Sequence, residues 1–196
     1  MDSNFFALIS RMRYIARWGL MRNALPENIQ EHSHMVAVLA HALGVIRRDI
    51  FHKPCDVNAL ATAALYHDAS EILTGDLPTP IKYHNAEIMS AYHAVEDLAV
   101  QKLLGMLPPE LRETYADVLS EDKDGDIYPL VKAADKLSAY IKCIEERKAG
   151  NNEFLSAEAQ TRAALEASPL PEVQYFLEHF IPAFERDLDE LGAIGQ

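Results

Sequence analysis

Apolar residues recur every three or four positions along most of the chain, which is the spacing that puts them on one face of a helix. Residues 85–106 and 128–149 show this pattern over the longest stretches. The same spacing predicts shorter helices over residues 4–17, 110–119, 154–167 and 172–191, one that starts near Asn28, and one that follows Asp56 and ends at Gly75. No stretch reads as a β-strand, so the predicted fold class is all-α, with eight or so helices.

Capping and breaking residues mark several of the predicted helix boundaries. Asn28, with Glu31 three residues later, has the pattern of an N-cap and its reciprocal partner. Gly75 is typical of a helix C-terminus, and the proline-rich segment that follows it cannot continue the helix. Pro182 is expected to kink the last helix.

Length and cysteine content favour one domain in a reducing compartment. The 196 residues fit a single domain, 1–196, that buries roughly 70% of its unfolded surface. Cys55 and Cys143 have neither a paired nor a metal-binding spacing. The N-terminus lacks the basic-then-apolar order of a signal peptide, and no apolar run is long enough to span a membrane. We therefore expect a cytoplasmic protein with no membrane partner.

The charge distribution excludes one class of partner. A net charge of −12 argues against binding a nucleic-acid polymer, because such binding depends on many lysine and arginine contacts to phosphates. The region from Ser3 to Pro26 has no acidic residue but contains Arg11, Arg13, Arg17 and Arg22. By itself this basic island is most simply a solvated helix face, although it leaves room for one small anion.

The segment from Tyr66 to Pro80 concentrates groups that can carry chemistry. It contains His67 and three acids, Asp68, Glu71 and Asp76. An unpaired buried charge costs more than a folded domain can offset, so a divalent cation is the simplest compensation. If the helix continues, Glu71 lies over the same face as His67 and Asp68, because it follows them by four and three residues.

Two further helices carry polar residues on faces that otherwise point inward. His32 lies four residues before Val36, and Asp135 lies on the stripe of Val131 and Ala139. A single inward His or Asp is usually a satisfied core residue. Together with His67 and Asp68, however, the set offers two nitrogens and two carboxylates, which suits a transition metal better than magnesium or calcium. The acidic segment 121–126 does not match a calcium loop and is interpreted as a solvated turn.

The order H…HD…D of these residues resembles the signature of HD-domain metal phosphohydrolases. The resemblance is closer to the bacterial HD-domain 5'-deoxynucleotidases, and it covers nearly the full length of the chain. The matching motifs are Arg17-Trp18, Glu31-His32-Ser33, Tyr66-His-Asp-Ala-Ser-Glu71, Thr74-Gly-Asp-Leu-Pro-Thr-Pro80, Lys132-Ala-Ala-Asp135 and Ala149-Gly-Asn-Asn-Glu-Phe154.

This resemblance implies an HD-domain bundle of about eight to ten helices that forms a homodimer and removes the phosphate from deoxyribonucleoside 5'-monophosphates. One divalent transition metal per chain, cobalt, manganese, iron or zinc, is implied. By similarity the metal ligands are His32, His67, Asp68 and Asp135. The nucleotide-binding set is Arg17, Trp18, His32, Asp68, Asp76, Leu77, Pro78, Thr79 and Asp135.

Residue chemistry indicates a role for each catalytic candidate. Arg17 offers a forked cation to the phosphate oxygens. Glu71 and Asp76 are the acid and base candidates: Glu71 is placed to orient or deprotonate the attacking water, and Asp76 to protonate the leaving 5' oxygen if its pKa is raised, and which acid takes which role stays open. Trp18 is interpreted either as a hydrophobic plug or as a wall that leaves no room for a 2'-hydroxyl.

Two alternative functions stay open at this point. The chain is another HD-type hydrolase, acting on nucleoside triphosphates or on cyclic or guanosine polyphosphate signals, or it is a helical nucleotide-binding module without catalysis. Glu71 and Asp76 argue against the second, because a purely structural metal site has no use for extra carboxylates.

Overall fold

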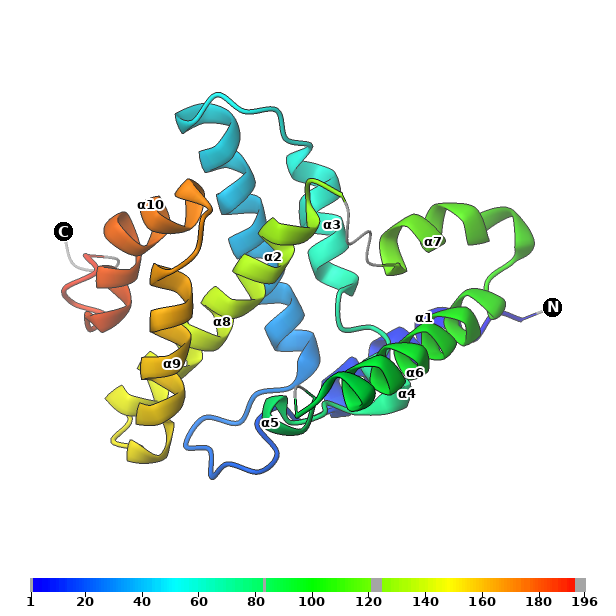
Figure 1. Ribbon diagram of the computed structural model, residues 1–196, viewed down its shortest axis with the longest axis horizontal. Coiled ribbons are helices and arrows are strands. Elements are labelled where there is room, and N and C mark those ends of the chain that lie inside the picture. Colours follow the sequence, from blue (N-terminus) through cyan, green and yellow to red (C-terminus); the bar gives the residue numbers. More distant parts are fainter. Residues whose placement is uncertain (1, 83, 121–124, 193–196) are drawn as a thin grey trace.

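The computed structural model describes residues 2–82, 84–120 and 125–192, and its regular secondary structure is helical (Figure 1). Within these ranges there is no β-strand, only an isolated bridge between Ala16 and Asn28. The predicted all-α fold class is confirmed. The α-helices are α1 (Phe5–Ile9), α2 (Ile29–Val45), α3 (Val57–Tyr66), α4 (Glu71–Thr74), α5 (Thr79–Lys82), α6 (Ala86–Gly105), α7 (Arg112–Leu119), α8 (Tyr128–Lys148), α9 (Leu155–Glu166) and α10 (Pro171–His179).

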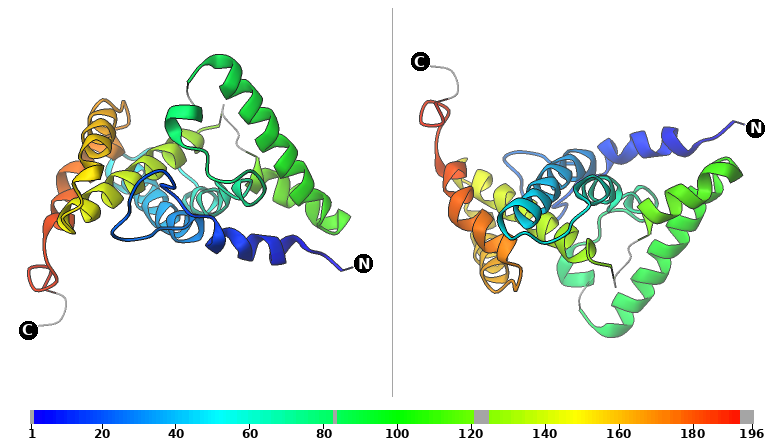
Figure 2. Two further views of the ribbon diagram at one scale, coloured as in Figure 1. Left: turned by 90° about the horizontal axis from the view of Figure 1, so that it is seen from below. Right: turned by 90° about the horizontal axis from the view of Figure 1, so that it is seen from above.

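Helix α2 is the centre of the larger apolar core. It packs against both α3 and α8, α9 covers α8, and α10 packs against α9 and α2 (Figure 1). A smaller core joins Phe5 of α1 to Ala69 and to Leu103 and Leu104 at the end of α6. Figure 2 shows α6 as a long rod on the opposite side of the molecule from α9 and α10.

Small residues let α2 and α3 approach each other closely. A Cβ atom added to Gly44 would lie 3.0 Å from Cδ2 of Leu60 and 3.3 Å from Cγ1 of Val57. The N-terminus of α2 is capped as predicted, because the Asn28 side chain accepts hydrogen bonds from the backbone N–H groups of Gln30 and Glu31. This cap holds the first turn of α2, which carries His32.

The N-terminal helix is shorter than predicted. Helix α1 ends at Ile9, a 3₁₀ turn covers Ser10–Tyr14, and the chain is extended at Ile15. The backbone leaves the helix because it pairs with the segment before α2: Arg17 N–H donates to Glu27 O at 3.0 Å, and Ile29 N–H donates to Ile15 O at 3.0 Å. The prediction of a helix over residues 4–17 is therefore wrong beyond Tyr14.

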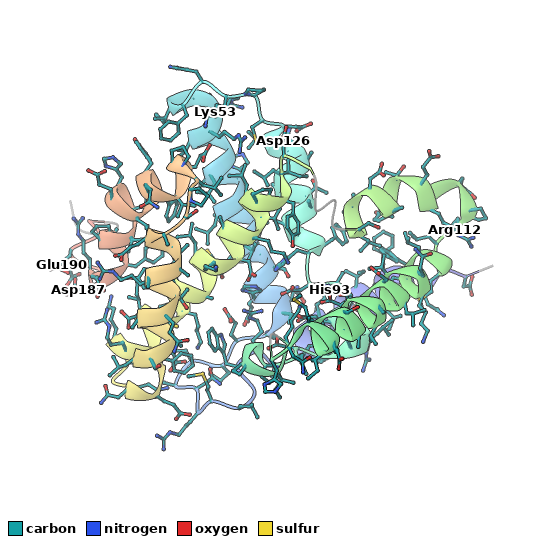
Figure 3. The ribbon with its side chains drawn as sticks, in the orientation of Figure 1. Lys53, His93, Arg112, Asp126, Asp187 and Glu190 are labelled. Atoms are coloured by element: carbon teal, nitrogen blue, oxygen red, sulfur yellow. The ribbon has the colours of Figure 1, made fainter. Side chains whose placement is uncertain are left out.

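The C-terminal helix also stops early. Instead of a kinked helix over residues 172–191, α10 ends at His179 and a 3₁₀ turn covers Ile181–Glu185. Pro182 has no N–H for the helical ladder and disfavours helical backbone at the residue before it, so it ends the helix rather than bending it. Beyond this point Asp187 and Glu190 bond each other's backbone N–H groups (Figure 3).

Two remaining expectations concern membrane-spanning helices and the acidic turn. No helix among the described residues is both long and apolar enough to cross a membrane. Residues 121–124 of the predicted acidic turn lie outside the described ranges. Cys143 is buried and Cys55 is partly buried, and both are free thiols.

Candidate metal centre and phosphate-binding site

Four side chains from three parts of the bundle meet at one point. His32 comes from α2, His67 and Asp68 follow the end of α3, and Asp135 comes from α8. His32 Nε2 lies 3.0 Å from Asp135 Oδ1 and 3.5 Å from Asp68 Oδ2, and His67 Nε2 lies 3.2 Å from Asp68 Oδ2. One ligand atom each from His32, His67 and Asp135 lie within 4.8 Å of one another. The structure thus brings together all four ligand candidates.

The two histidines present unsatisfied nitrogens to this point. The Nε2 atoms of His32 and His67 are buried and have no hydrogen-bond partner in the described part of the chain. Nδ1 of His67 lies 2.8 Å from Ala64 O, a pure acceptor, so Nδ1 carries a proton and Nε2 is the nitrogen that faces the acids. Buried nitrogens facing two carboxylates fit a divalent transition metal, which would bind each imidazole, in its neutral form, through Nε2.

The two acids of the cluster are held as carboxylates. Burial alone would raise the pKa of Asp68, but His67, His32 and Arg17 lower it far below its usual value. Burial likewise opposes ionisation of Asp135, and the adjacent His32 lowers its pKa. Asp68 and Asp135 can therefore each offer an anionic carboxylate oxygen as a metal ligand at neutral pH.

The prediction that Glu71 shares one continuous helix with His67 is wrong. Helix α3 ends at Tyr66, a turn covers residues 67–70, and α4 starts at Glu71. Tight bonds from Ala69 N–H to Tyr66 O at 2.9 Å and from Glu71 N–H to Asp68 O at 3.0 Å form this turn. The turn lets the adjacent His67 and Asp68 face one point, which neighbours on a regular helix, about 100° apart, do not do.

Glu71 and Asp76 lie beside the cluster in different environments. Oε2 of Glu71 is buried and unpaired among the described residues, and burial together with Asp68 and Asp76 raises the pKa of Glu71. Burial and Asp68 also raise the pKa of Asp76, whereas Arg17 and the Trp18 backbone N–H lower it. Gly75 separates the two acids with a φ of 76°, which ends α4 as predicted.

Arg17 is the member of the basic island that reaches the cluster. Its side chain is only 13% exposed, with Nη1 3.4 Å from Asp68 Oδ2 and Nε 3.0 Å from Glu27 Oε2. Burial acts to lower the pKa of Arg17, but Asp68, Asp135 and Glu27 raise it. Arg22 is 85% exposed and pairs with Glu153, and Arg11 lies over the exposed ring of Tyr14. The solvated-face interpretation therefore holds for the rest of the island.

Trp18 follows Arg17 in a strained backbone conformation. Its φ is 57°, its indole Nε1 donates to Glu27 Oε2 at 3.1 Å, and its ring centroid lies 5.2 Å from that of Phe154. Leu77 and Pro78 are partly exposed on the segment after Gly75, and Thr79 begins α5. The backbone N–H of Trp18 contacts the Asp76 carboxyl and so links Trp18 to this segment.

A buried ion pair fixes the loop that carries Trp18. Glu146 of α8 accepts hydrogen bonds from the backbone N–H groups of Ala24, at 2.8 Å, and Leu25, at 3.0 Å. Lys142, one turn earlier, pairs with Glu146 and donates to Leu25 O. Asn151 Nδ2 donates to Glu146 Oε2 at 2.8 Å. The loop is therefore tied to the same helix that carries Asp135.

Two residues that support the cluster were not predicted from the sequence. Ser138 Oγ lies 3.1 Å from His32 Nδ1, and Glu27 contacts both Arg17 and Trp18. A signal existed for each: Ser138 follows Asp135 by three residues on one helix face, and Glu27 is the first acid after the basic island. His93, labelled on α6 in Figure 3, and His84 do not belong to the metal-ligand group found among the described residues.

Replacing Ser138 by Ala is expected to weaken divalent-metal binding by about 10–100-fold, because Ser138 is the hydrogen-bond partner that orients His32. Competition with a fluorescent chelator measures this affinity without reference to activity. Ser156, on the exposed side of α9, is the matched control for the same substitution. Equal metal affinity of Ser138→Ala and the unmodified protein would show that the serine does not support the ligand.

Sequence comparison connects this geometry to known proteins. Residues 4–184 match a family model described as 5'-deoxynucleotidase YfbR-like. A relative from Shigella boydii, named 5'-deoxynucleotidase YfbR, is 50% identical over 192 residues, which cover 97% of this chain and 96% of the relative.

Solved structures share the fold. An HD-domain phosphohydrolase from Listeria innocua superposes with a TM-score of 0.82 at 25% identity, covering 92% of this chain and 88% of that chain. The HD phosphohydrolase DatZ of cyanophage S-2L, solved with dA and one catalytic Zn²⁺ ion, gives a TM-score of 0.60 at 25% identity, covering 97% of this chain and 99% of that chain.

Proposed function

The chain belongs to the YfbR-like 5'-deoxynucleotidase family, and from that premise we propose that it is a metal-dependent 5'-deoxynucleotidase. It hydrolyses deoxyribonucleoside 5'-monophosphates to deoxyribonucleosides and phosphate. The observation that supports this function is the convergence of four side chains, those of His32, His67, Asp68 and Asp135. The Arg17 guanidinium contacts one of them, Asp68.

The four clustered side chains would hold one divalent transition metal per chain. When bound, such an ion supplies Lewis-acid activation of water and of a phosphoryl oxygen. Cobalt, manganese, iron and zinc all suit two imidazoles and two carboxylates. The catalytic Zn²⁺ of the cyanophage DatZ structure supports the presence of one ion.

Arg17 binds the phosphate in this proposal. Its Nε and Nη1 atoms contact Glu27 and Asp68, and its Nη2 has no acceptor among the described residues. Nη2 is thus free to donate to a phosphate oxygen beside the metal ligands. A permanently charged donor there neutralises the charge that develops as the phosphoryl group is transferred.

Glu71 and Asp76 act on the water and on the leaving group in this proposal. The buried, unpaired Oε2 of Glu71 can hydrogen-bond to the attacking water and orient it. Asp76, whose pKa is raised by burial, is suited to give a proton to the leaving 5' oxygen. Leu77, Pro78 and Thr79 continue from Asp76 and would contact the nucleotide, while Trp18 would pack against the deoxyribose.

Phosphate release from dAMP, AMP, dATP and cyclic AMP, each measured with cobalt, manganese and zinc, tests the function. We expect dAMP to be the preferred substrate. Comparable kcat/KM values for AMP and dAMP would contradict a sugar-selecting role of Trp18. Preference for dATP or cyclic AMP would indicate another HD-type hydrolase, and no phosphate from any deoxynucleotide would favour the binding module.

Three further properties are proposed. We infer a homodimer from the family resemblance, a single domain over residues 1–196 from the chain length, and a cytoplasmic location from the cysteine spacing and the apolar pattern. A mass measurement by light scattering at several protein concentrations tests the dimer.

A further inference from the structure

One carboxylate oxygen holds two neighbouring side chains of the proposed nucleotide site. Oε2 of Glu27 accepts a hydrogen bond from Arg17 Nε at 3.0 Å and another from Trp18 Nε1 at 3.1 Å. The backbone of the same residue also takes part, because Glu27 O accepts from the Arg17 N–H at 3.0 Å. Glu27 is mostly buried, with 16% of its side chain exposed.

We propose that Glu27 is a positioning residue that orients Arg17 and Trp18 together, and so couples phosphate binding to the choice of sugar. The proposal rests on the proposed function for the roles of these two side chains. The contacts themselves do not depend on it.

The guanidinium plane of Arg17 is defined by two carboxylates. Nε is bound to Glu27, and Nη1 is bound to Asp68, a proposed metal ligand. A planar fork held at two of its nitrogens can point its third nitrogen in only one direction. Without Glu27 the side chain keeps a single contact, at Asp68, and can rotate about it.

Trp18 depends on Glu27 in a different way. Its φ of 57° is uncommon for a bulky residue and persists only where the surroundings hold it. Asn23 Nδ2 bonds the Trp18 carbonyl at 3.3 Å and Phe154 packs on the ring, but the bond to Glu27 is the polar contact that sets the rotation of the indole.

Empty space next to Glu27 makes this support hard to replace. A cavity of about 210 Å³ borders Glu27, with Leu25 and Met35 among its walls. Shortening the Glu27 side chain would enlarge this cavity. Arg17 Nε and the indole N–H would lose their shared acceptor and gain room to change rotamer, so both groups are expected to move at once.

The sharpest test uses the fact that Trp18 is the single tryptophan of the chain. Its indole N–H gives one signal in a ¹H–¹⁵N spectrum, and its fluorescence reports one environment. In Glu27→Ala we expect the indole signal to shift or broaden and acrylamide quenching to rise. Glu27→Gln, which keeps one acceptor oxygen without the charge, is expected to lie between Glu27→Ala and the unmodified protein.

Kinetics provide the second readout. We expect Glu27→Ala to lower kcat/KM for dAMP by about tenfold or more, and to lower the ratio of kcat/KM for dAMP over AMP by about fivefold. If Glu27 were merely structural, its loss would lower kcat/KM for dAMP and for AMP by the same factor. Glu145→Ala is the matched control, because Glu145 borders the same cavity, is exposed, and contacts neither Arg17 nor Trp18 among the described residues. Both quantities should stay within about twofold in this control.

The outcomes separate this inference from the function on which it rests. An unmodified protein that releases no phosphate from dAMP would refute the nucleotidase function and with it the coupling. An active protein whose Glu27→Ala and Glu27→Gln variants keep the dAMP-to-AMP ratio, or keep the indole signal and its quenching, would refute the positioning role alone.

Discussion

Replacing Glu71 by Ala is expected to lower kcat for dAMP by about 10²–10⁴-fold while nucleotide and metal still bind. The Glu71 carboxyl makes no hydrogen bond or ion pair to a metal-ligand side chain among the described residues, yet its Oε2 is buried and unpaired beside Asp68. A buried acid without a partner costs free energy, so its retention indicates a role that the protein alone does not satisfy.

Three measurements on Glu71→Ala separate catalysis from binding. Single-turnover phosphate release gives the chemical step, calorimetry gives dAMP affinity, and elemental analysis gives metal content. Glu87→Ala, an exposed acid in the first turn of α6, is the matched control. Near-normal turnover in Glu71→Ala would remove this residue from the mechanism.

The second large effect is expected for stability. Glu146→Ala should lower the free energy of unfolding by about 3–5 kcal/mol, because it leaves Lys142 buried without its partner. It also removes the acceptor of two backbone N–H groups, those of Ala24 and Leu25. Urea unfolding followed by circular dichroism measures the change. The double variant Lys142→Met, Glu146→Met should recover part of the loss, because no buried charge remains.

The same carboxylate gives this effect a pH dependence. Burial alone would raise the pKa of Glu146, but hydrogen bonds from Lys142, Asn151 and the loop lower it from 4.5 to about 2. The stabilisation is therefore fully present above the unfolded value of 4.5 and is lost as the pH falls towards 2. A Glu146→Ala variant whose unfolding free energy differs from the unmodified protein by less than about 1 kcal/mol at pH 7 would contradict the prediction.

Helix periodicity was enough to predict that two of the metal-ligand candidates point inward. His32 and Asp135 are polar residues on inward-facing stripes, and a regular helix fixes the direction of a side chain relative to its neighbours. The structure places both on regular helices, α2 and α8. Their meeting point with His67 could be inferred because all three stripes face one core.

The parts that could not be predicted lie where the backbone has no period. Glu27 reaches Arg17 across ten residues of irregular loop, and the turn after Tyr66 replaces the expected continuous helix. The early end of α10 has a related cause, because a proline in a helical pattern predicts a kink and a stop equally well. Only tertiary packing decides between them.

The ligand set lies at the seam between the two apolar cores. His32 and Asp135 project from α2 and α8, which build the larger core, whereas His67 and Asp68 directly precede Ala69, which belongs to the smaller core with Phe5. A metal ion bound by all four side chains would cross-link the two apolar cores. Its binding free energy would then add to the free energy of unfolding, so the protein would become more stable as metal occupancy rises.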